Sequence, residues 1–208
     1  NGHCDEPGDF LVVIDDTNAS GVDFSGVQGM AFDTNGRLYM VDGTDMIAYA
    51  EDLTADGDFQ DAGEIVVIYD PNDPNIPFPL GALLGLALGA DGYLYVSGVN
   101  WNGTDVIWRI RDFNSDDDIY DTGELEIYYQ DTDPISGLPI ADIDLSSCFG
   151  LAFDHDGYLI MGDLLSSNGI GMCFDYNMDN DVNDPGETWW YRDGSAIEKH
   201  WTNSVAVS

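Results

Sequence analysis

The sequence predicts an all-β protein, a β-propeller built from four-stranded antiparallel blades. Three observations support this prediction: a hairpin motif occurs three times, a longer acidic motif occurs three times in step with it, and no segment shows helical periodicity. Short strands at regular spacing are typical of architectures in which each repeat forms one small sheet. We therefore expect the 208 residues to form one continuous array of blades.

The hairpin motif provides the first two strands of each expected blade. It has the form G-[ML]-A-[FL]-x-x-[ND]-G-[RY]-L-[YI]-[MV] and covers residues 29–40, 85–96 and 150–161. An apolar run, a turn with Asn-Gly or Asp-Gly and a second apolar run predict a β-hairpin. Apolar runs on either side of the acidic motif predict a third strand (46–49, 106–110 and 171–174) and a fourth strand (65–69, 125–129 and 188–191).

The acidic motif D-x-[NT]-x-D-x-D-x-x-D-x-G-E joins the third and fourth strands and covers residues 52–64, 112–124 and 175–187. Side-chain oxygens at alternate positions of a short loop match the roughly six to eight oxygen ligands that Ca²⁺ takes. The carboxylates of one loop also repel each other, by on the order of 1 kcal/mol for each close pair even in water. An ordered loop therefore implies a bound cation.

We predict three Ca²⁺ sites, one in each acidic loop. The candidate ligands carry a side-chain oxygen at position 1, 3, 5, 7, 10 or 13 of their loop. They are Asp52, Thr54, Asp56, Asp58, Asp61, Glu64, Asp112, Asn114, Asp116, Asp118, Asp121, Glu124, Asp175, Asn177, Asp179, Asp181, Asp184 and Glu187. The sequence leaves open whether the aspartate at position 10 or the glutamate at position 13 closes each site, because the glutamate has an alternative orientation toward a neighbouring strand.

The repeats predict three whole blades plus two partial ones. The whole blades are expected at about 27–70, 83–130 and 148–192. Residues 1–26 are expected to end a preceding blade, with a strand over 10–14, and residues 193–208 to begin a following blade. Propellers close with about four to eight blades, and open edge strands are avoided in soluble proteins. We therefore expect a segment of a larger propeller, with closure by another copy as the alternative.

The composition limits the partners. The formal net charge is −35, from 40 acidic and 5 basic residues, and the charge outside the loops is still strongly acidic. A halophilic or marine setting is a second cause of such a surface. Nucleic acid is not expected as a partner, because no basic patch is present. No apolar run of membrane-spanning length occurs. Weak Ca²⁺ loops suit millimolar Ca²⁺, so an extracellular or cell-surface location is expected.

Cysteine is sparse, with Cys4, Cys148 and Cys173. Their spacing does not form a C-x-x-C zinc pattern. Cys148 and Cys173 fall in the first and third strands of one expected blade, where either a disulfide or two buried free thiols fit the sequence. Cys4 has no expected partner within this chain.

The hairpin motif, over roughly residues 27–191, resembles the blade core of NHL-repeat propellers and of the related sugar-lactone lactonase and soluble quinoprotein glucose dehydrogenase propellers. The acidic loops resemble the Ca²⁺ loops of EF-hands, dockerins and the integrin alpha propeller. They depart from the integrin-type loop, whose last carboxylate is at position 9, because the aspartate here is at position 10. They depart from the EF-hand, whose glutamate is at position 12, because the glutamate here is at position 13. The resemblance implies a Ca²⁺-binding propeller.

Two function classes fit the sequence. The first is a non-catalytic extracellular Ca²⁺-binding propeller with a structural, adhesion or surface-assembly role, whose partners are other blades, further copies, carbohydrate or a cell-surface protein. The second, which the resemblance implies, is a propeller enzyme of the lactonase or quinoprotein type with a site at the central channel. The expected inner strands offer Gln28, Leu84 and Phe149 at corresponding positions, and this mostly apolar set favours the first class.

Overall fold

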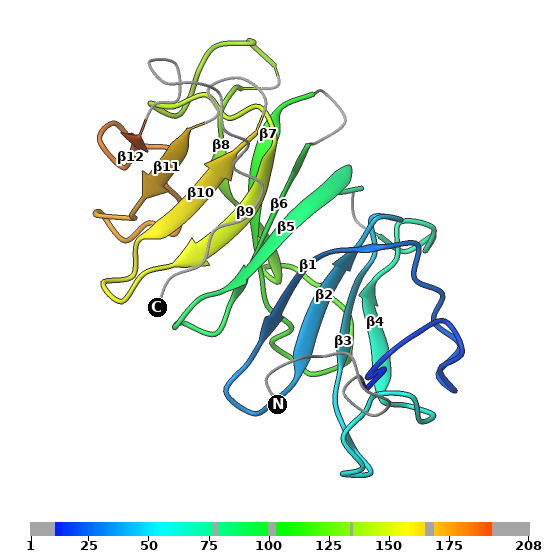
Figure 1. Cartoon of the computed structure of the whole chain (residues 1–208). Helices are drawn as coiled ribbons and strands as arrows, with labels where there is room; N and C mark the ends of the chain where they lie inside the picture. Colours follow the sequence, from blue (N-terminus) through cyan, green and yellow to red (C-terminus); the bar gives the residue numbers. More distant parts are fainter. Residues whose placement is uncertain (1–10, 77–78, 100–102, 134, 165–168, 193–208) are drawn as a thin grey trace.

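The computed structural model describes residues 11–76, 79–99, 103–133, 135–164 and 169–192. All regular elements in these residues are β-strands, which form three four-stranded antiparallel sheets (Figure 1). The first blade contains β1 (Val27–Phe32), β2 (Leu38–Asp42), β3 (Ile47–Ala50) and β4 (Ile65–Tyr69). The second contains β5 (Ala82–Leu88), β6 (Leu94–Val99), β7 (Asp105–Ile110) and β8 (Leu125–Gln130). The third contains β9 (Cys148–Phe153), β10 (Leu159–Asp163), β11 (Ile170–Cys173) and β12 (Thr188–Arg192).

The strands of each blade pair in chain order, and the blades contact each other through their first strands. β1 packs against β5, and β5 packs against β9, so these three strands form the inner side of the array (Figure 1). This arrangement of small antiparallel sheets is that of a β-propeller. The predicted fold class is therefore confirmed, and the three described blades form an open array. Within the described residues no helix has the length and apolar character needed to cross a membrane.

The first glycine of the hairpin motif allows the inner strands to approach closely. A Cβ atom on Gly29 would lie 2.8 Å from the backbone nitrogen of Leu86, and one on Gly85 would lie 2.7 Å from the carbonyl oxygen of Phe149. Real Cβ atoms do not approach backbone atoms this closely, so any larger residue would push neighbouring blades apart. The repeated glycine is therefore a requirement of blade-to-blade packing.

The residue that precedes this glycine forms a β-bulge in the first strand of each described blade. The pairing register shifts between Val27 and Gly29, and the same shift recurs in the other two blades. The extra residues are Gln28, Leu84 and Phe149. A bulge of this kind bends the strand and changes the direction of one side chain.

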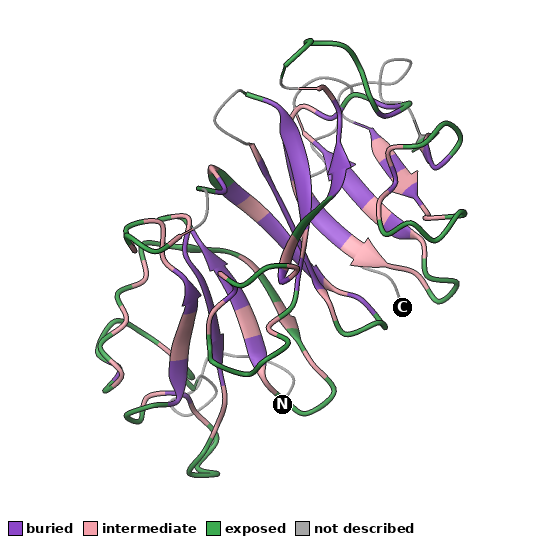
Figure 2. Cartoon of the chain, turned by 180° about the vertical axis from the view of Figure 1, so that it is seen from behind, coloured by how far each residue is buried: buried purple, intermediate pink, exposed green. Residues whose placement is uncertain are grey.

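Apolar side chains fill the space between consecutive blades, and Figure 2 shows the buried residues concentrated on the strands. Val41 and Ile47 of the first blade pack in one cluster with Val96 and Trp108 of the second. A second cluster joins the second blade to the third and contains the fully buried Leu159. Full burial of a large apolar side chain stabilises the fold by about 1.5–3 kcal/mol.

The expected partial blades at the two ends of the chain fall only partly within the described residues. The prediction of a strand over residues 10–14 is wrong for residues 11–14, which the structure describes and which are not in a strand. Ile14, Val22 and Phe24 instead pack against the first blade. Residues 1–10 and the expected first strand near 203–208 lie outside the described residues.

The two described cysteines are free thiols. Cys148 and Cys173 are both fully buried, and no disulfide joins them. Burial raises the pKa of the Cys148 thiol to about 12, so it stays protonated at neutral pH. Of the two alternatives from the sequence, the structure shows buried free thiols, while Cys4 lies outside the described residues.

Candidate metal centres in the acidic loops

The three acidic loops share one backbone conformation. Left-handed φ angles occur at positions 4, 6 and 12 of each loop. These residues are Ala55, Gly57 and Gly63; Ser115, Asp117 and Gly123; and Met178, Asn180 and Gly186. A left-handed residue other than glycine costs on the order of 1–3 kcal/mol and persists only where its surroundings hold it in place. The loops are therefore specific structures, not merely solvated acidic turns.

The aspartate at position 1 holds these strained residues. In the second loop, one carboxylate oxygen of Asp112 accepts the N–H of Ser115 at 2.6 Å, and the other accepts the N–H of Asp117 at 3.1 Å. The position-1 aspartates of the other two loops make the same pair of hydrogen bonds. This carboxylate thus turns the chain so that the following side chains face one point.

The glutamate at position 13 points into the loop and not toward a neighbouring strand. Glu64, Glu124 and Glu187 are only 1%, 2% and 3% exposed. One carboxylate oxygen of each accepts the N–H of the residue at position 2, at 2.8–2.9 Å. In the first two loops the other oxygen accepts the N–H of the position-10 aspartate. The glutamate therefore closes the loop from its buried side.

The aspartate at position 10 faces the same point from the exposed side. In the second loop, the amide nitrogen of Asn114 lies 2.8 Å from both Asp116 and Asp121. In the third loop, the Asn177 amide likewise bridges the carboxylates at positions 5 and 10. The two ends of an amide are assigned from hydrogen bonding. A half-turn of the amide would present its oxygen to a cation held by the same carboxylates, with loss of the hydrogen bond that this oxygen accepts from the N–H of the position-5 aspartate.

Two loops bring three carboxylates together. Ligand oxygens of Asp116, Asp118 and Glu124 all lie within 4.8 Å of one another, as do those of Asp175, Asp179 and Glu187. Oxygen Oε2 of Glu187 is buried and has no hydrogen-bond partner in the described structure. A buried carboxylate oxygen without a partner carries the full cost of desolvation. These donors, all hard oxygen atoms, fit Ca²⁺.

The first loop has a less complete arrangement of candidate ligands than the other two. Its backbone and its glutamate match those of the other loops, but Thr54 replaces asparagine at position 3. Residues 52–64 show no group of three carboxylates as close as those in the other loops. The candidate ligands Asp52, Thr54, Asp56, Asp58, Asp61 and Glu64 therefore form the least preorganised of the three sets.

The second and third loops also insert an apolar side chain, at position 8, between two blades. Ile119 of the second loop is fully buried in the cluster that joins the first and second blades. Val182 of the third loop is equally buried in the cluster that joins the second and third. The N–H of Val182 donates to the carbonyl oxygen of Tyr128 in β8. The conformation of a loop thus determines the packing of the preceding blade.

The residue at position 6 receives a second contact from the preceding blade. The hydroxyl of Tyr49 in β3 donates to Asp117 at 2.6 Å, and the guanidinium of Arg109 in β7 donates to Asn180 at 2.7 Å. Tyr49 and Arg109 each lie three residues before the first aspartate of their own loop. Burial and the Asp117 carboxylate raise the pKa of Tyr49, which therefore remains a donor. Sequence reasoning missed this contact, although the shared offset was visible.

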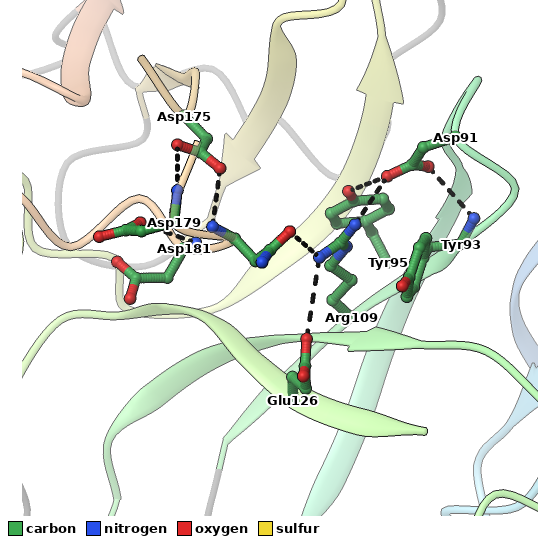
Figure 3. Close-up of polar contacts among 9 residues, drawn as sticks. Asp91, Tyr93, Tyr95, Arg109, Glu126, Asp175, Asp179 and Asp181 are labelled. Carbon is green, nitrogen blue, oxygen red and sulfur yellow. Dashed lines mark hydrogen bonds and ion pairs between the residues drawn. The ribbon is translucent and has the colours of Figure 1, made fainter. Parts of the chain in front are cut away.

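Arg109 is the centre of a larger polar network between the second and third blades (Figure 3). Its guanidinium lies 3.4 Å from Asp91 and 3.7 Å from Glu126, and 3.6 Å from the centre of the Tyr93 ring. The hydroxyl of Tyr95 donates to the same Asp91 at 2.8 Å. This arginine thereby connects the hairpin turn of its own blade to the acidic loop of the next.

A cavity of about 430 Å³ lies beside this network. Its lining includes Arg109, Asp175 and the turn Asp154–Asp156. Side-chain atoms of Asp154, His155 and Asp156 lie within 4.8 Å of one another. The His155 side chain is 86% exposed, so it lies at the surface of the hairpin turn.

The fold and the loops together define a class: β-propeller blades that contact each other through acidic loops with a common conformation. Neither a family model nor a curated protein matches the chain. The resemblance to NHL-repeat, lactonase and quinoprotein propellers therefore extends only to the propeller fold.

Solved structures similar to the chain include virginiamycin B lyase from Staphylococcus aureus, at 19% identity and a TM-score of 0.46, over 82% of this chain and 43% of that one. They also include the extracellular domains of two hybrid two-component systems from B. thetaiotaomicron. The first has 12% identity and a TM-score of 0.47, over 90% of this chain and 19% of that one. The second has 16% identity and a TM-score of 0.38, over 86% of this chain and 23% of that one. The chain thus spans less than half the length of each structure.

Proposed function

We propose that this chain is an extracellular Ca²⁺-binding β-propeller segment with a structural, adhesion or surface-assembly role. One Ca²⁺ binds in each acidic loop, and in the second and third loops the ion fixes the contact with the preceding blade. The observation that carries the proposal is the convergence of Asp175, Asp179 and Glu187, with one buried oxygen of Glu187 left without a hydrogen bond. Such an oxygen is stabilised by a cation and is unfavourable without one.

The positions of the loops support a structural role for the ion. A loop that loses its cation regains the repulsion between its carboxylates. Its position-8 side chain, such as Ile119, and its position-6 contact, such as that from Tyr49, both depend on the loop conformation. Loss of the ion therefore weakens the contact between two blades as well as the loop itself.

The chemistry of the proposed sites supports an extracellular location. Loops that are exposed on one side and rich in carboxylates suit the millimolar Ca²⁺ found outside cells. The net charge of −35 further provides carboxylates that can be shared between neighbouring molecules through cations. This supports partners that are further copies of the chain, other blades or an acidic cell-surface glycan or protein.

The experiment is a calorimetric titration of Ca²⁺ into chelator-treated protein. Wild-type protein is expected to bind one ion in each loop, the first loop most weakly. Glu187→Gln keeps an oxygen that can accept the N–H of Tyr176 but removes the charge, so it should abolish binding in the third loop alone.

Asp33→Asn is the matched control, because it removes one charge from a hairpin turn that contains no proposed ligand. It should leave the number of bound ions unchanged. Absence of binding at millimolar Ca²⁺ in the wild-type protein would overturn the proposal, as would equal binding by the wild type and Glu187→Gln.

A further inference from the structure

In the described structure, the first blade leaves one face without a neighbouring blade. In the other two blades, the residue after the repeated glycine packs against the preceding blade: Leu86 is 5% exposed and Leu151 is 7% exposed. The equivalent residue of the first blade, Met30, is 66% exposed, and Phe32 on the same side of β1 is 62% exposed. We call this side, formed by Met30 and Phe32, the leading face. It is apolar surface of a kind that is buried wherever one described blade follows another.

Among the described residues, the third blade leaves its opposite face uncovered, at the other end of the array (Figure 1). Four residues after the loop glutamate, Ile68 of β4 and Tyr128 of β8 are buried against the next blade. The equivalent residue of the third blade, Tyr191 of β12, is 71% exposed. Met172 of β11 corresponds to Tyr49, which also packs against the next blade, but Met172 is only half-buried. We call the side formed by Met172 and Tyr191 the trailing face.

The two faces match in the polar contact that both of them lack. Between the described blades, the residue three positions before one acidic loop donates to the side chain at position 6 of the next loop. The trailing face has Met172 in the donor position, and the first loop has Gly57 in the acceptor position. A contact between the two faces therefore leaves no member of this pair without its partner. Met172 against a loop such as the second would instead bury the carboxylate of Asp117 without its donor, which is unfavourable.

The trailing face also replaces two charges that the equivalent side of the first blade carries. There, Arg37 and Glu51 form an ion pair at 2.8 Å. In the third blade, Tyr158 and Phe174 stand in these positions, with ring centres 4.9 Å apart. Copies of a chain with a net charge of −35 repel each other over most of their surface. An aromatic face without these charges is therefore a place at which a second copy can approach.

Residues 11–14 hold the place of the outer strand of a preceding blade. The N–H of Phe59, at position 8 of the first loop, donates to the carbonyl oxygen of Val13 at 2.7 Å, as position 8 of the third loop donates to β8 at 2.9 Å. Residues 11–14 pair with no strand in the described part of the chain, and the side chains of residues 11–13 are exposed. A strand that already belongs to a sheet brings its own pairing, so it is more stable at this place than an isolated segment.

We propose that the leading face is a docking surface for the trailing face of a second copy of this chain, in a head-to-tail contact. The contact continues the interface that the described blades make with each other. Tyr191 of the partner subunit takes the place of Val13 as the acceptor for Phe59, and residues 11–14 give way to the docked strand. Two copies with three blades each bring six blades together, within the range of about four to eight at which propellers close. The inference names the partner for the assembly role proposed above and rests on that proposal in this respect.

The test is the mass of the protein in solution, measured by analytical ultracentrifugation at physiological salt with millimolar Ca²⁺. Wild-type protein is expected to sediment as two copies. Every head-to-tail contact contains one leading and one trailing face, so Met30→Glu and Tyr191→Glu should each weaken association more than about tenfold. Both residues are exposed in the single chain, so neither change disturbs its fold.

A mixture of the two variants tests the arrangement of the contact. Each variant keeps the face that the other has lost, so one intact contact can form between unlike copies. The mixture should contain a species of two copies, while each variant alone sediments as a single chain. Failure of the mixture to associate would overturn the head-to-tail arrangement, because a heterologous contact needs only one intact face from each copy.

Ile135→Glu is the matched control. It places the same charge at a 95% exposed apolar residue, in the connection between β8 and β9, which belongs to neither face. It should leave association unchanged. The inference is overturned if wild-type protein is a single chain at every soluble concentration, or if Met30→Glu and Tyr191→Glu associate as tightly as Ile135→Glu. Bound ions are counted separately by the titration with Glu187→Gln, so failure here is distinguishable from failure of the proposed function.

Discussion

The hydroxyl of Tyr49 in β3 donates a 2.6 Å hydrogen bond to the carboxylate of Asp117, so a strand of the first blade is bound to the acidic loop of the second. Arg109 and Asn180 repeat this relationship one blade later. The acidic loops are therefore part of the interface between blades.

Removal of the Tyr49 hydroxyl should weaken the first interface. Tyr49→Phe keeps the ring, which lies beneath the Arg37 guanidinium at 4.0 Å, and deletes only the donor to Asp117. We expect a loss of about 1 kcal/mol in the free energy of unfolding, measured by urea denaturation. Tyr191→Phe, on a 71% exposed side chain, is the control and should be neutral. Equal stability of the two variants would contradict this role for Tyr49.

Asn180→Gly should test the second interface without disturbing the backbone. Asn180 has a φ of 77°, which glycine adopts freely, and the first loop already has Gly57 at this position. The variant loses the acceptor for Arg109, so we expect a destabilisation of about 1 kcal/mol by urea denaturation. Asn180→Asp keeps an acceptor and should retain most of the stability. A larger loss for Asn180→Asp than for Asn180→Gly would refute the contact.

Gly85→Ala should disrupt the inner packing of the blades. The added methyl would lie 2.7 Å from the Phe149 carbonyl oxygen, and relief of that overlap requires a backbone shift. Overpacking of this kind costs about 1–3 kcal/mol, and we expect the upper part of that range. Gly21→Ala is the comparison, because it places a methyl in open space at a φ of 75° and so measures backbone strain alone. Thermal unfolding should rank Gly85→Ala well below Gly21→Ala.

Removal of Ca²⁺ should lower the melting temperature. An ion that binds only the folded state stabilises it by about 2.7 kcal/mol at a hundredfold excess over Kd. We therefore expect a clear decrease in the melting temperature when a chelator is added at low ionic strength, and recovery when Ca²⁺ is restored in excess. Mg²⁺ should restore less of the melting temperature, because it requires a more regular octahedral set of ligands. A melting curve that chelation leaves unchanged would exclude a structural ion.

Stability should depend on pH through Asp42. Burial raises the pKa of this carboxylate, but hydrogen bonds from Gly26, Thr44 and Ser25 outweigh burial and lower the pKa to about 2. Because the folded pKa is below the unfolded value of about 3.9, the stabilisation is fully present above pH 4 and is lost as the pH falls toward 2. It amounts to about 2 kcal/mol.

The measurement for Asp42 is the free energy of unfolding from pH 7 to pH 2, compared with that of Asp42→Asn. The difference between the two proteins should shrink across the acidic part of this range. A difference that stays constant down to pH 2 would show that the carboxylate charge does not stabilise the fold.

Local patterns in the sequence were sufficient to predict the blades. The Asn-Gly and Asp-Gly turns and the apolar runs beside them predicted strands that the structure places in three antiparallel sheets. The prediction succeeded because turn chemistry and strand periodicity act over a few residues. It did not extend to residues 11–14, where an apolar run resembling a fourth strand is not in a strand in the structure.

The sequence predicted the orientation of side chains within the loops only in part. Repetition identified which residues carry oxygen, but the sequence did not decide between positions 10 and 13 as the closing carboxylate. The structure places Glu124 on the buried side and Asp121 on the exposed side of one loop, with both facing inward. This depends on left-handed residues such as Ser115 and Asp117, whose conformation results from bonds to Asp112 and not from their own preference.

The sequence by itself determined the repeat, the turns and the oxygen-rich loops, because each is encoded by neighbouring residues. Only the tertiary structure decided that Tyr49 meets Asp117 across 68 residues and that Asp105 and Asp131 are buried. The physical reason is that burial and charge proximity depend on how whole sheets pack. A single buried aspartate and an exposed one have the same letter in the sequence, and only packing separates them.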